Sequence, residues 1–156
     1  YGELKPCFDN GFAAVANGTY LAACVCFITG IEMSLRLPLL LAMGKDITDA
    51  WDSNLVPLMN HSLLRRAKDI GLPVELLAFS YEMKDEFLTN IESTDIAKRV
   101  RITQLRNNIC HGNLNIFVTD IEGKPGVHHA DIEKEAKELE SIVRRWADGF
   151  SQCLNS

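Results

Sequence analysis

The stretch YLAACVCFITGIEMSLRLPLLLAM, residues 20–43, carries only two charged side chains and decides the fold. It predicts one long helix, kinked near Pro38 and stopped by Gly44. The two charged residues, Glu32 and Arg36, are four positions apart and therefore share one face of that helix, where they can form an ion pair. An opposite-charge pair in an otherwise apolar helix indicates a structural ion pair within a protein core.

A membrane span is the alternative interpretation of this stretch. Its uninterrupted apolar piece, Tyr20–Ile31, has only twelve residues, whereas a helix needs about 20 apolar residues to cross a bilayer. Glu32, Arg36 and Pro38 interrupt the apolar run that follows. We therefore expect a buried core helix and no membrane association.

The composition is that of an ordinary globular domain. The chain has 156 residues, of which 47% are hydrophobic and 24% charged, and its formal net charge is −5. A domain of about 150 residues buries enough surface to fold without disulfides or metal. These values exclude a disordered tail, a collagen-like chain and a disulfide-dense scaffold, and the acidic charge disfavours a generally basic nucleic-acid coat.

The cysteines favour a reducing compartment. There are five of them, an odd number, and no two stand in a C-x2-C pair. Unpaired thiols of this kind predict a cytoplasmic protein. The first residue is Tyr1 and not Met, so we expect upstream residues, which can include a targeting segment.

Cap and stop residues predict further helices in the rest of the chain. We expect a short helical turn at Asp46–Trp51, a helix capped by Asn60 and running through Ile70, a helix from Pro73 to about Ile91, a helix from the cap residues Ser93–Asp95 to Gly112, and a last helix from Asp131 to about Leu154. Asn115–Ile121 reads as a strand and Gly123–Gly126 as a turn. The predicted fold class is all-α, a single domain over residues 1–156 with four to five helices in a bundle and a small β-hairpin before the last helix.

The chemistry is concentrated in residues 104–113, Gln-Leu-Arg-Asn-Asn-Ile-Cys-His-Gly-Asn. Arg106 and His111 are separated by four residues, and Asn107 directly follows the arginine. An arginine and a histidine at this spacing are weak evidence alone. The added Asn, the Gly112 after the histidine and the position at the end of a late helix make the pattern more specific.

This motif resembles that of the HEPN superfamily (higher eukaryote and prokaryote nucleotide-binding domains), whose hallmark is R-x4-6-H, often R-N-x3-H. The all-helical layout over about residues 20–154 is also similar. The resemblance implies a metal-independent ribonuclease of the toxin–antitoxin, antiviral-defence or RNA-processing kind, with no cofactor. It further implies a homodimer whose two motifs line one cleft, and control by an antitoxin or a fused regulatory domain. Some members carry a tyrosine two residues past the histidine as a modification site; Asn113 stands here, so that regulation is not carried over.

The motif suits cleavage of RNA without a metal ion. Histidine titrates near neutrality and can move protons at the 2′-hydroxyl or the leaving oxygen, so His111 is the expected acid–base group. Arginine stays charged and presents a planar fork to phosphate oxygens, so Arg106 is the expected transition-state cation. Asn107 can bind the phosphate or orient His111. The expected products are a 2′,3′-cyclic phosphate and a 5′-hydroxyl end.

Helix geometry limits how these residues can act together. On an ideal helix, Arg106 and His111 point about 140° apart, whereas Asn107 and His111 share a face. Either the arginine curls round, or the helix ends near Cys110, or a two-fold dimer brings each histidine to the arginine of its partner.

Basic residues near the motif are candidates for binding the RNA backbone. Lys98, Arg99 and Arg101 precede Arg106 and give this segment a positive charge in an acidic chain. Glu32 and Arg36 are candidate groups that support the motif from the first long helix. A second basic group, Arg65, Arg66 and Lys68, is more simply explained as a solvated helix face.

Other candidates are weaker. His128, His129 and Asp131 lack a convincing metal-ligand spacing and indicate a surface loop or the entry to a helix. Cys110 beside His111 is expected to be a buried filler and not a nucleophile, and His61 is expected to be structural. Two further functions stay open: a non-catalytic dimer that binds a nucleotide, RNA or a protein in the same cleft, and a purely structural bundle in which the motif is accidental.

Overall fold

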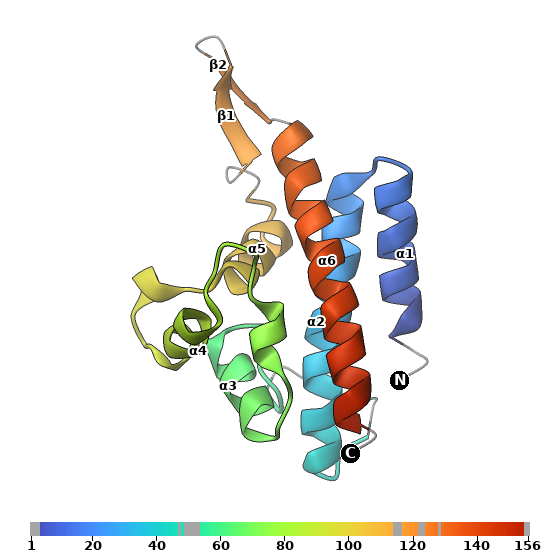
Figure 1. Cartoon of the computed structure of the whole chain (residues 1–156), viewed down its shortest axis with the longest axis vertical. Coiled ribbons are helices and arrows are strands. Elements are labelled where there is room, and N and C mark those ends of the chain that lie inside the picture. Colours follow the sequence, from blue (N-terminus) through green and yellow to red (C-terminus); the bar gives the residue numbers. More distant parts are fainter. Residues whose placement is uncertain are drawn as a thin grey trace.

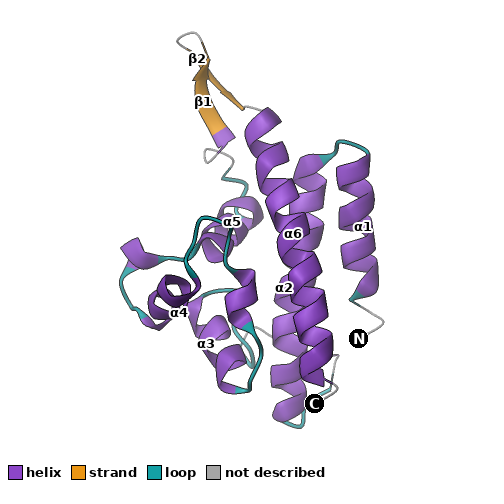
Figure 2. Cartoon of the chain, in the orientation of Figure 1, coloured by secondary structure: helices purple, strands orange, loops and turns teal. Residues whose placement is uncertain are grey.

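The computed structural model describes residues 4–46, 48, 54–113, 117–121, 124–127 and 129–154. Over these residues the chain is an all-α bundle, as predicted (Figures 1 and 2). The α-helices are α1 (Lys5–Ala16), α2 (Tyr20–Ala42), α3 (His61–Asp69), α4 (Lys84–Glu92), α5 (Arg101–Cys110) and α6 (His129–Leu154). Two short 3₁₀ helices, η2 (Val74–Leu77) and η3 (Ile96–Lys98), and two strands, β1 (Val118–Ile121) and β2 (Lys124–Val127), complete the described elements.

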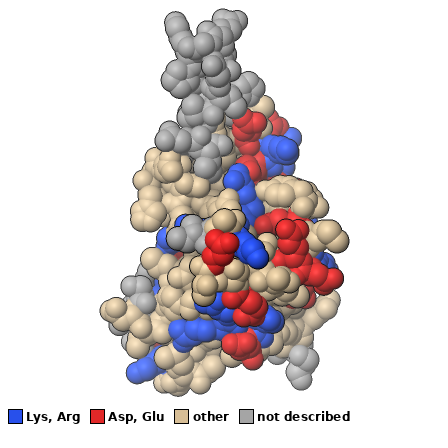
Figure 3. All heavy atoms as spheres, turned by 90° about the vertical axis from the view of Figure 1, so that its left-hand side faces the viewer, with Lys and Arg blue, Asp and Glu red and all other residues tan. Residues whose placement is uncertain are grey.

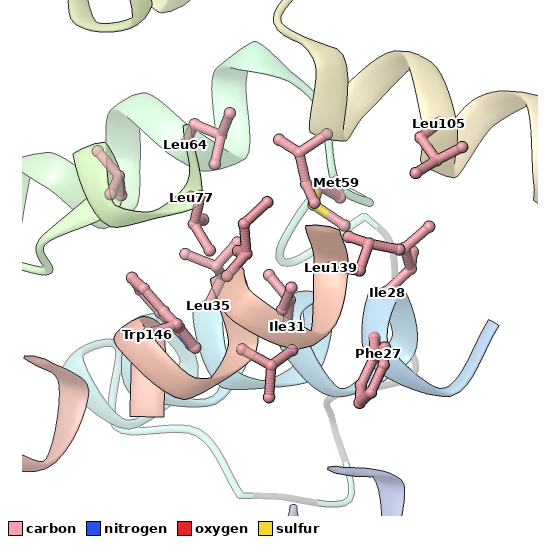
Figure 4. Close-up of a cluster of buried hydrophobic side chains, with 14 of the residues drawn as sticks. Phe27, Ile28, Ile31, Leu35, Met59, Leu64, Leu77, Leu105, Leu139 and Trp146 are labelled. Atoms are coloured by element: carbon pink, nitrogen blue, oxygen red, sulfur yellow. The ribbon is translucent and has the colours of Figure 1, made fainter. Parts of the chain in front are cut away.

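The apolar helix α2 is the centre of the bundle. It contacts α1, α6, α3 and α5. In Figure 1, α1, α2 and α6 run alongside one another, and the shorter helices α3–α5 lie together on one side of α2 and α6. Figure 4 shows the core where these groups meet, with Ile31 and Leu35 of α2 on the same side as Leu139 and Trp146 of α6. Each such buried side chain stabilises the fold by about 1.5–3 kcal/mol.

The limits of α2 agree with the sequence-based prediction. The helix covers Tyr20–Ala42 and ends where Gly44 adopts the left-handed conformation, with φ of 66°. Within the described residues, α2 is one helix that is long and apolar enough to cross a membrane by length and composition, with a mean hydropathy of 1.7. The twelve residues Tyr20–Ile31 therefore understate the apolar length of this helix. In this fold 61% of that apolar window is buried, as is usual for a core helix.

Helix α1 was not predicted, and it packs on α2 through two reciprocal glycine contacts. Gly11 of α1 lies against the ring of Phe27 in α2, and Gly30 of α2 lies against the ring of Phe8 in α1. A methyl group on Gly30 would come within 2.5 Å of the Phe8 ring, so neither glycine can be enlarged without moving an aromatic side chain. Helix α1 has no side-chain cap, so a proline in its first turn, Pro6, is the start signal that its sequence offers.

The helix predicted from Pro73 to Ile91 is wrong, because the chain turns between η2 and α4. Ala78 is extended, with φ of −63° and ψ of 136°. Two carboxylates satisfy the backbone of this turn: Glu82 Oε2 accepts from the N–H of Phe79 at 2.9 Å, and Glu138 Oε1 of α6 accepts from the N–H of Ser80 at 2.6 Å. These bonds replace the ones a continuous helix would make.

The helix predicted from the Ser93–Asp95 caps also begins later than expected. Asp95 does cap a helix, accepting from the N–H of Ala97 at 2.9 Å, but that helix is the short η3. Arg99 is then extended, and α5 begins at Arg101. The other cap prediction holds, since Asn60 Oδ1 accepts from the N–H of Leu63 at the start of α3.

A small antiparallel hairpin precedes α6, in the region where one was predicted. Its register pairs Val118 with Val127 and Ile121 with Lys124. Because Lys124–Val127 is strand β2, the turn does not extend over Gly123–Gly126 as predicted. The positions between the strands, most of the predicted turn at Asp46–Trp51, and Asn115 and His128 lie outside the described residues.

A buried hydrogen-bond chain ties α6 to α2. Trp146 Nε1 donates to Ser34 Oγ at 2.7 Å, and Ser34 Oγ donates to the carbonyl of Ile31 at 2.7 Å. Both side chains are almost completely buried. The serine therefore serves the indole N–H without leaving a polar atom unsatisfied.

Replacing Ser34 by Ala should lower the free energy of unfolding by about 1–3 kcal/mol, because the buried indole N–H loses its acceptor. Urea denaturation of both proteins measures this loss. In a Trp146→Phe background, which has no N–H to satisfy, the same substitution should cost much less. An equal cost in both backgrounds would show that the hydrogen bond contributes nothing.

Candidate functional site

The motif occupies the end of α5, where the chain forms a regular helix stop. Gly112 has φ of 65°, its N–H donates to the carbonyl of Ile109 at 3.1 Å, and the N–H of Asn113 donates to the carbonyl of Asn108 at 2.8 Å. This is the Schellman arrangement, which requires a residue that tolerates the left-handed conformation. His111 is the last residue before this turn, and its side chain is exposed.

The Arg106 side chain is held by an ion pair with Glu32 of helix α2. Its Nε donates to Glu32 Oε2 at 2.9 Å, and Glu32 Oε1 lies 3.7 Å from an Nη of Arg36. Arg36 in turn donates to the carbonyl of Val56 at 3.1 Å. The structure therefore brings together three of the predicted site residues, Glu32, Arg36 and Arg106, in one ion-pair network between α2 and α5.

The network leaves the two terminal nitrogens of Arg106 without an acceptor among the described residues. The Arg106 side chain is 10% exposed and that of Glu32 is 13% exposed. Glu32 binds the Nε of Arg106, and no described residue accepts a hydrogen bond from its two terminal nitrogens. A guanidinium held in this way has a fixed orientation. Its two terminal nitrogens can still donate two parallel hydrogen bonds to the oxygens of one phosphate.

Asn107 and Arg99 share a surface pocket. This pocket, of about 310 Å³, lies between the start of α3, the segment that follows α4, and α5. We call it the α3–α5 pocket. Thr103 also lines it, one turn before Asn107 on the same face of α5. His111 follows Asn107 by one further turn, so the exposed imidazole lies beyond the pocket on the same side of the helix.

The other predicted substrate-binding residues differ in their surroundings. Lys98 is exposed. Arg101 is mostly buried and forms an ion pair with Glu135 of α6, while its backbone N–H donates to Glu82 Oε1 at 2.8 Å. Arg99 and Arg101 line a second pocket of about 410 Å³, together with Glu82 and Glu86. Of the three basic residues, Arg101 is thus the one that an acidic side chain within the described part of the chain engages.

The second basic group mainly stabilises the fold. Arg65 donates to the carbonyl oxygens of Ile91 and Glu92 at the end of α4, at 3.1 and 3.4 Å. Arg66 donates to the carbonyl of Leu55, and Lys68 pairs with Glu92. These contacts fit the simpler interpretation of this group as part of a helix surface.

Charges of both signs alternate over this side of the molecule. Figure 3 looks onto the side that carries α3 and α4 and shows Lys and Arg interspersed with Asp and Glu. Among the described residues no continuous basic surface is visible there. Binding of an RNA backbone would therefore depend on a few placed cations and not on a broad positive field.

His61 is structural, as predicted, and it also lines the α3–α5 pocket. Its Nε2 accepts from the N–H of Val100 at 3.3 Å, so its Nδ1 carries the proton and donates to the carbonyl of Ser93 at 3.4 Å. Burial lowers the pKa of His61 below its usual value of 6.5, and the nearby charges of Arg65 and Arg99 lower this pKa further. The ring is thus a neutral bridge between α3 and the start of α5.

Sequence reasoning missed the acidic anchors Glu82 and Glu135, because their partners lie 19 and 34 residues away. It also missed the pocket, which is assembled from three separate segments. No group of three metal-ligating side chains occurs among the described residues. His129 contacts the ring of Tyr20 edge to face, with centroids 5.3 Å apart, which agrees with a role at the start of α6.

Three comparisons with known proteins found no match for the chain. No protein-family model, no curated protein and no solved structure matches the chain.

Proposed function

We propose that this protein is a HEPN-type endoribonuclease that cleaves RNA without a metal ion. The observation that carries the proposal is the Arg106 side chain, whose Nε is fixed by Glu32 while its terminal nitrogens have no acceptor among the described residues. A fixed cation of this kind stabilises the charge that develops on a phosphorane-like transition state. His111, exposed at the end of the same helix, supplies an imidazole for the proton transfers.

The reaction is a transfer within the RNA strand. The imidazole of His111 takes the proton of a 2′-hydroxyl, and the 2′-oxygen attacks the adjacent phosphorus. The bond from phosphorus to the 5′-oxygen breaks, and this oxygen leaves with a proton from an imidazolium. The products are a 2′,3′-cyclic phosphate and a 5′-hydroxyl end, so neither water nor metal is consumed in this step.

A two-fold homodimer would complete the site. Arg106 and His111 point about 140° apart on one helix, so each histidine is better placed to meet the arginine of a second copy. Such a dimer also supplies two imidazoles, one as base and one as acid. A toxin, antiviral-defence or RNA-processing role, with control by an antitoxin or a fused regulatory domain, belongs to this proposal through the resemblance of the motif.

The test is cleavage of a single-stranded RNA in the presence of excess EDTA. We expect cutting, 2′,3′-cyclic phosphate ends detected by mass spectrometry, and no cutting of DNA of the same sequence. An RNA with one 2′-deoxy sugar 5′ to each cut site should resist at that position alone. Cleavage that EDTA stops, or that tolerates the 2′-deoxy sugar, would disprove the mechanism.

A non-catalytic module that binds a nucleotide, RNA or a protein partner is the second candidate. It is favoured by the ion pair of Arg101 with Glu135, which engages one of the three predicted RNA-binding cations, and by the net charge of −5. Tight binding of an RNA that is never cut, at any protein concentration, would support this candidate over the enzyme.

A further inference from the structure

The α3–α5 pocket has the size and the chemistry of a small-ligand site. Its volume of about 310 Å³ lies at the lower end of the range for pockets that hold small molecules. Two arginines, Arg65 and Arg99, face it together with the carboxylate of Asp95. That carboxylate already accepts a hydrogen bond from the N–H of Ala97. The charged side chains of the lining therefore sum to one positive charge, which favours an anion.

The two arginines differ in how far they are already engaged. Arg65 uses Nη1 on the carbonyl oxygens of Ile91 and Glu92, so it is anchored beside the pocket. Arg99 is exposed, and none of the described residues accepts a hydrogen bond from its guanidinium. It lines this pocket and also the second pocket beside it. The guanidinium of Arg99 can therefore reorient and donate hydrogen bonds to a ligand in the pocket.

Uncharged polar groups complete the lining. Ser62 and Thr94 contribute hydroxyl groups, and Asn107 contributes an amide. No hydrogen bond within the described residues uses these three side chains. A hydroxyl or an amide can both donate and accept, so this set can bind a sugar hydroxyl or the edge of a base as well as a phosphate oxygen.

The pocket includes one residue of the motif, Asn107. Thr103, Asn107 and His111 follow one another at intervals of four residues, about 6 Å along the axis of α5. Thr103 and Asn107 line the pocket, and His111 stands exposed one turn further on. An RNA strand whose reacting phosphate lies at His111 would place a neighbouring nucleotide near Asn107.

We propose that the α3–α5 pocket binds one nucleotide of single-stranded RNA, adjacent to the cleaved bond, with Arg99 on its phosphate and Asn107 between this nucleotide and His111. The inference rests on the proposed ribonuclease function for the identity of its ligand. It adds a specificity site to that function, because the hydroxyl and amide groups of the pocket touch the sugar and the base.

The test uses an unmodified RNA tetranucleotide, which keeps the sugar hydroxyls, and is made in the His111→Ala background so that the RNA is not cleaved during the measurement. Calorimetry measures its binding to the full chain. Arg99→Gln should weaken binding at least about tenfold, because a charge-assisted hydrogen bond is lost. Lys134→Gln, which removes one positive charge from an exposed position of α6 outside the pocket, is the matched control and should change binding less than about twofold.

A second readout is the imidazole of His61, which lines the pocket and takes no part in the proposed chemistry. Its pKa, followed by the NMR shift of its ring proton, should rise when the tetranucleotide binds, because a nearby phosphate favours the charged form. Equal losses of affinity in Arg99→Gln and Lys134→Gln, or bound RNA that leaves the pKa of His61 unchanged, would overturn the inference. Absence of any binding would overturn it as well.

Parallel cleavage of the unmodified RNA separates this inference from the proposed function. If the protein cuts RNA while the pKa of His61 does not move, the ribonuclease stands and the pocket assignment fails. If no RNA is cut, but binding depends on Arg99 and shifts the pKa of His61, the pocket assignment stands and the ribonuclease fails.

Discussion

Replacing His111 by Ala is expected to reduce RNA cleavage at least about a hundredfold, the usual loss when a general acid–base group is removed. The free energy of unfolding should change little, because the imidazole is exposed and makes no hydrogen bond with any described residue. Single-turnover cleavage and urea denaturation measure the two effects.

Cys110→Ala is the matched control for this substitution. Cys110 is the neighbouring residue, and it is not expected to act as a nucleophile. The expectation that it is buried is wrong, because at the end of α5 its side chain is exposed like that of His111. Cleavage by this variant should equal that of the wild type. If His111→Ala retained full activity, or if both variants lost activity equally, His111 would not be the acid–base group.

Replacing Glu32 by Ala is expected to lower the free energy of unfolding by about 3 kcal/mol, the lower end of the cost of breaking a buried ion pair. The substitution leaves Arg106 without the acceptor of its Nε, and it removes the carboxylate beside Arg36, a side chain that is only 3% exposed. For a domain of this size the melting temperature should fall by about 6–12 °C.

Glu92→Ala provides the comparison for an exposed ion pair. Glu92 pairs with Lys68 at 2.7 Å, and both side chains are largely exposed. Removing it should change the melting temperature far less than removing Glu32. Equal effects in calorimetry would show that the network around Glu32 contributes no more than a surface ion pair.

Local signals in the sequence predicted the helix ends well. Gly44 and Gly112 stop α2 and α5 with positive φ, and Asn60 caps α3 through its own side chain. Each of these effects depends on residues within one or two turns, so the sequence displays it directly. The interruption after η2 depends on Glu138, 58 residues away from Ser80. No periodicity within residues 73–91 can reveal such a partner.

The candidate site also combines features that local sequence predicts with features that depend on residues far apart in the chain. The positions of Arg106, Asn107 and His111 at the end of a helix follow from the local sequence. The bond between Glu32 and Arg106 joins residues 74 positions apart; the sequence suggested only that Glu32 and Arg36 support the motif. The engagement of Arg101 by Glu135 and the assembly of the α3–α5 pocket depend on how separate segments pack, and composition and spacing do not encode that arrangement visibly.

The central place of α2 has a consequence for synthesis of the protein. A large part of the surface that buries α2 comes from α6, which begins only at His129. At ordinary translation rates, about 4–17 seconds separate Ala42 from His129. During that time the apolar surface of α2 can pack only against helices that have already been synthesised. The part of α2 that α6 later buries stays exposed on the nascent chain, where ribosome-associated chaperones can bind it.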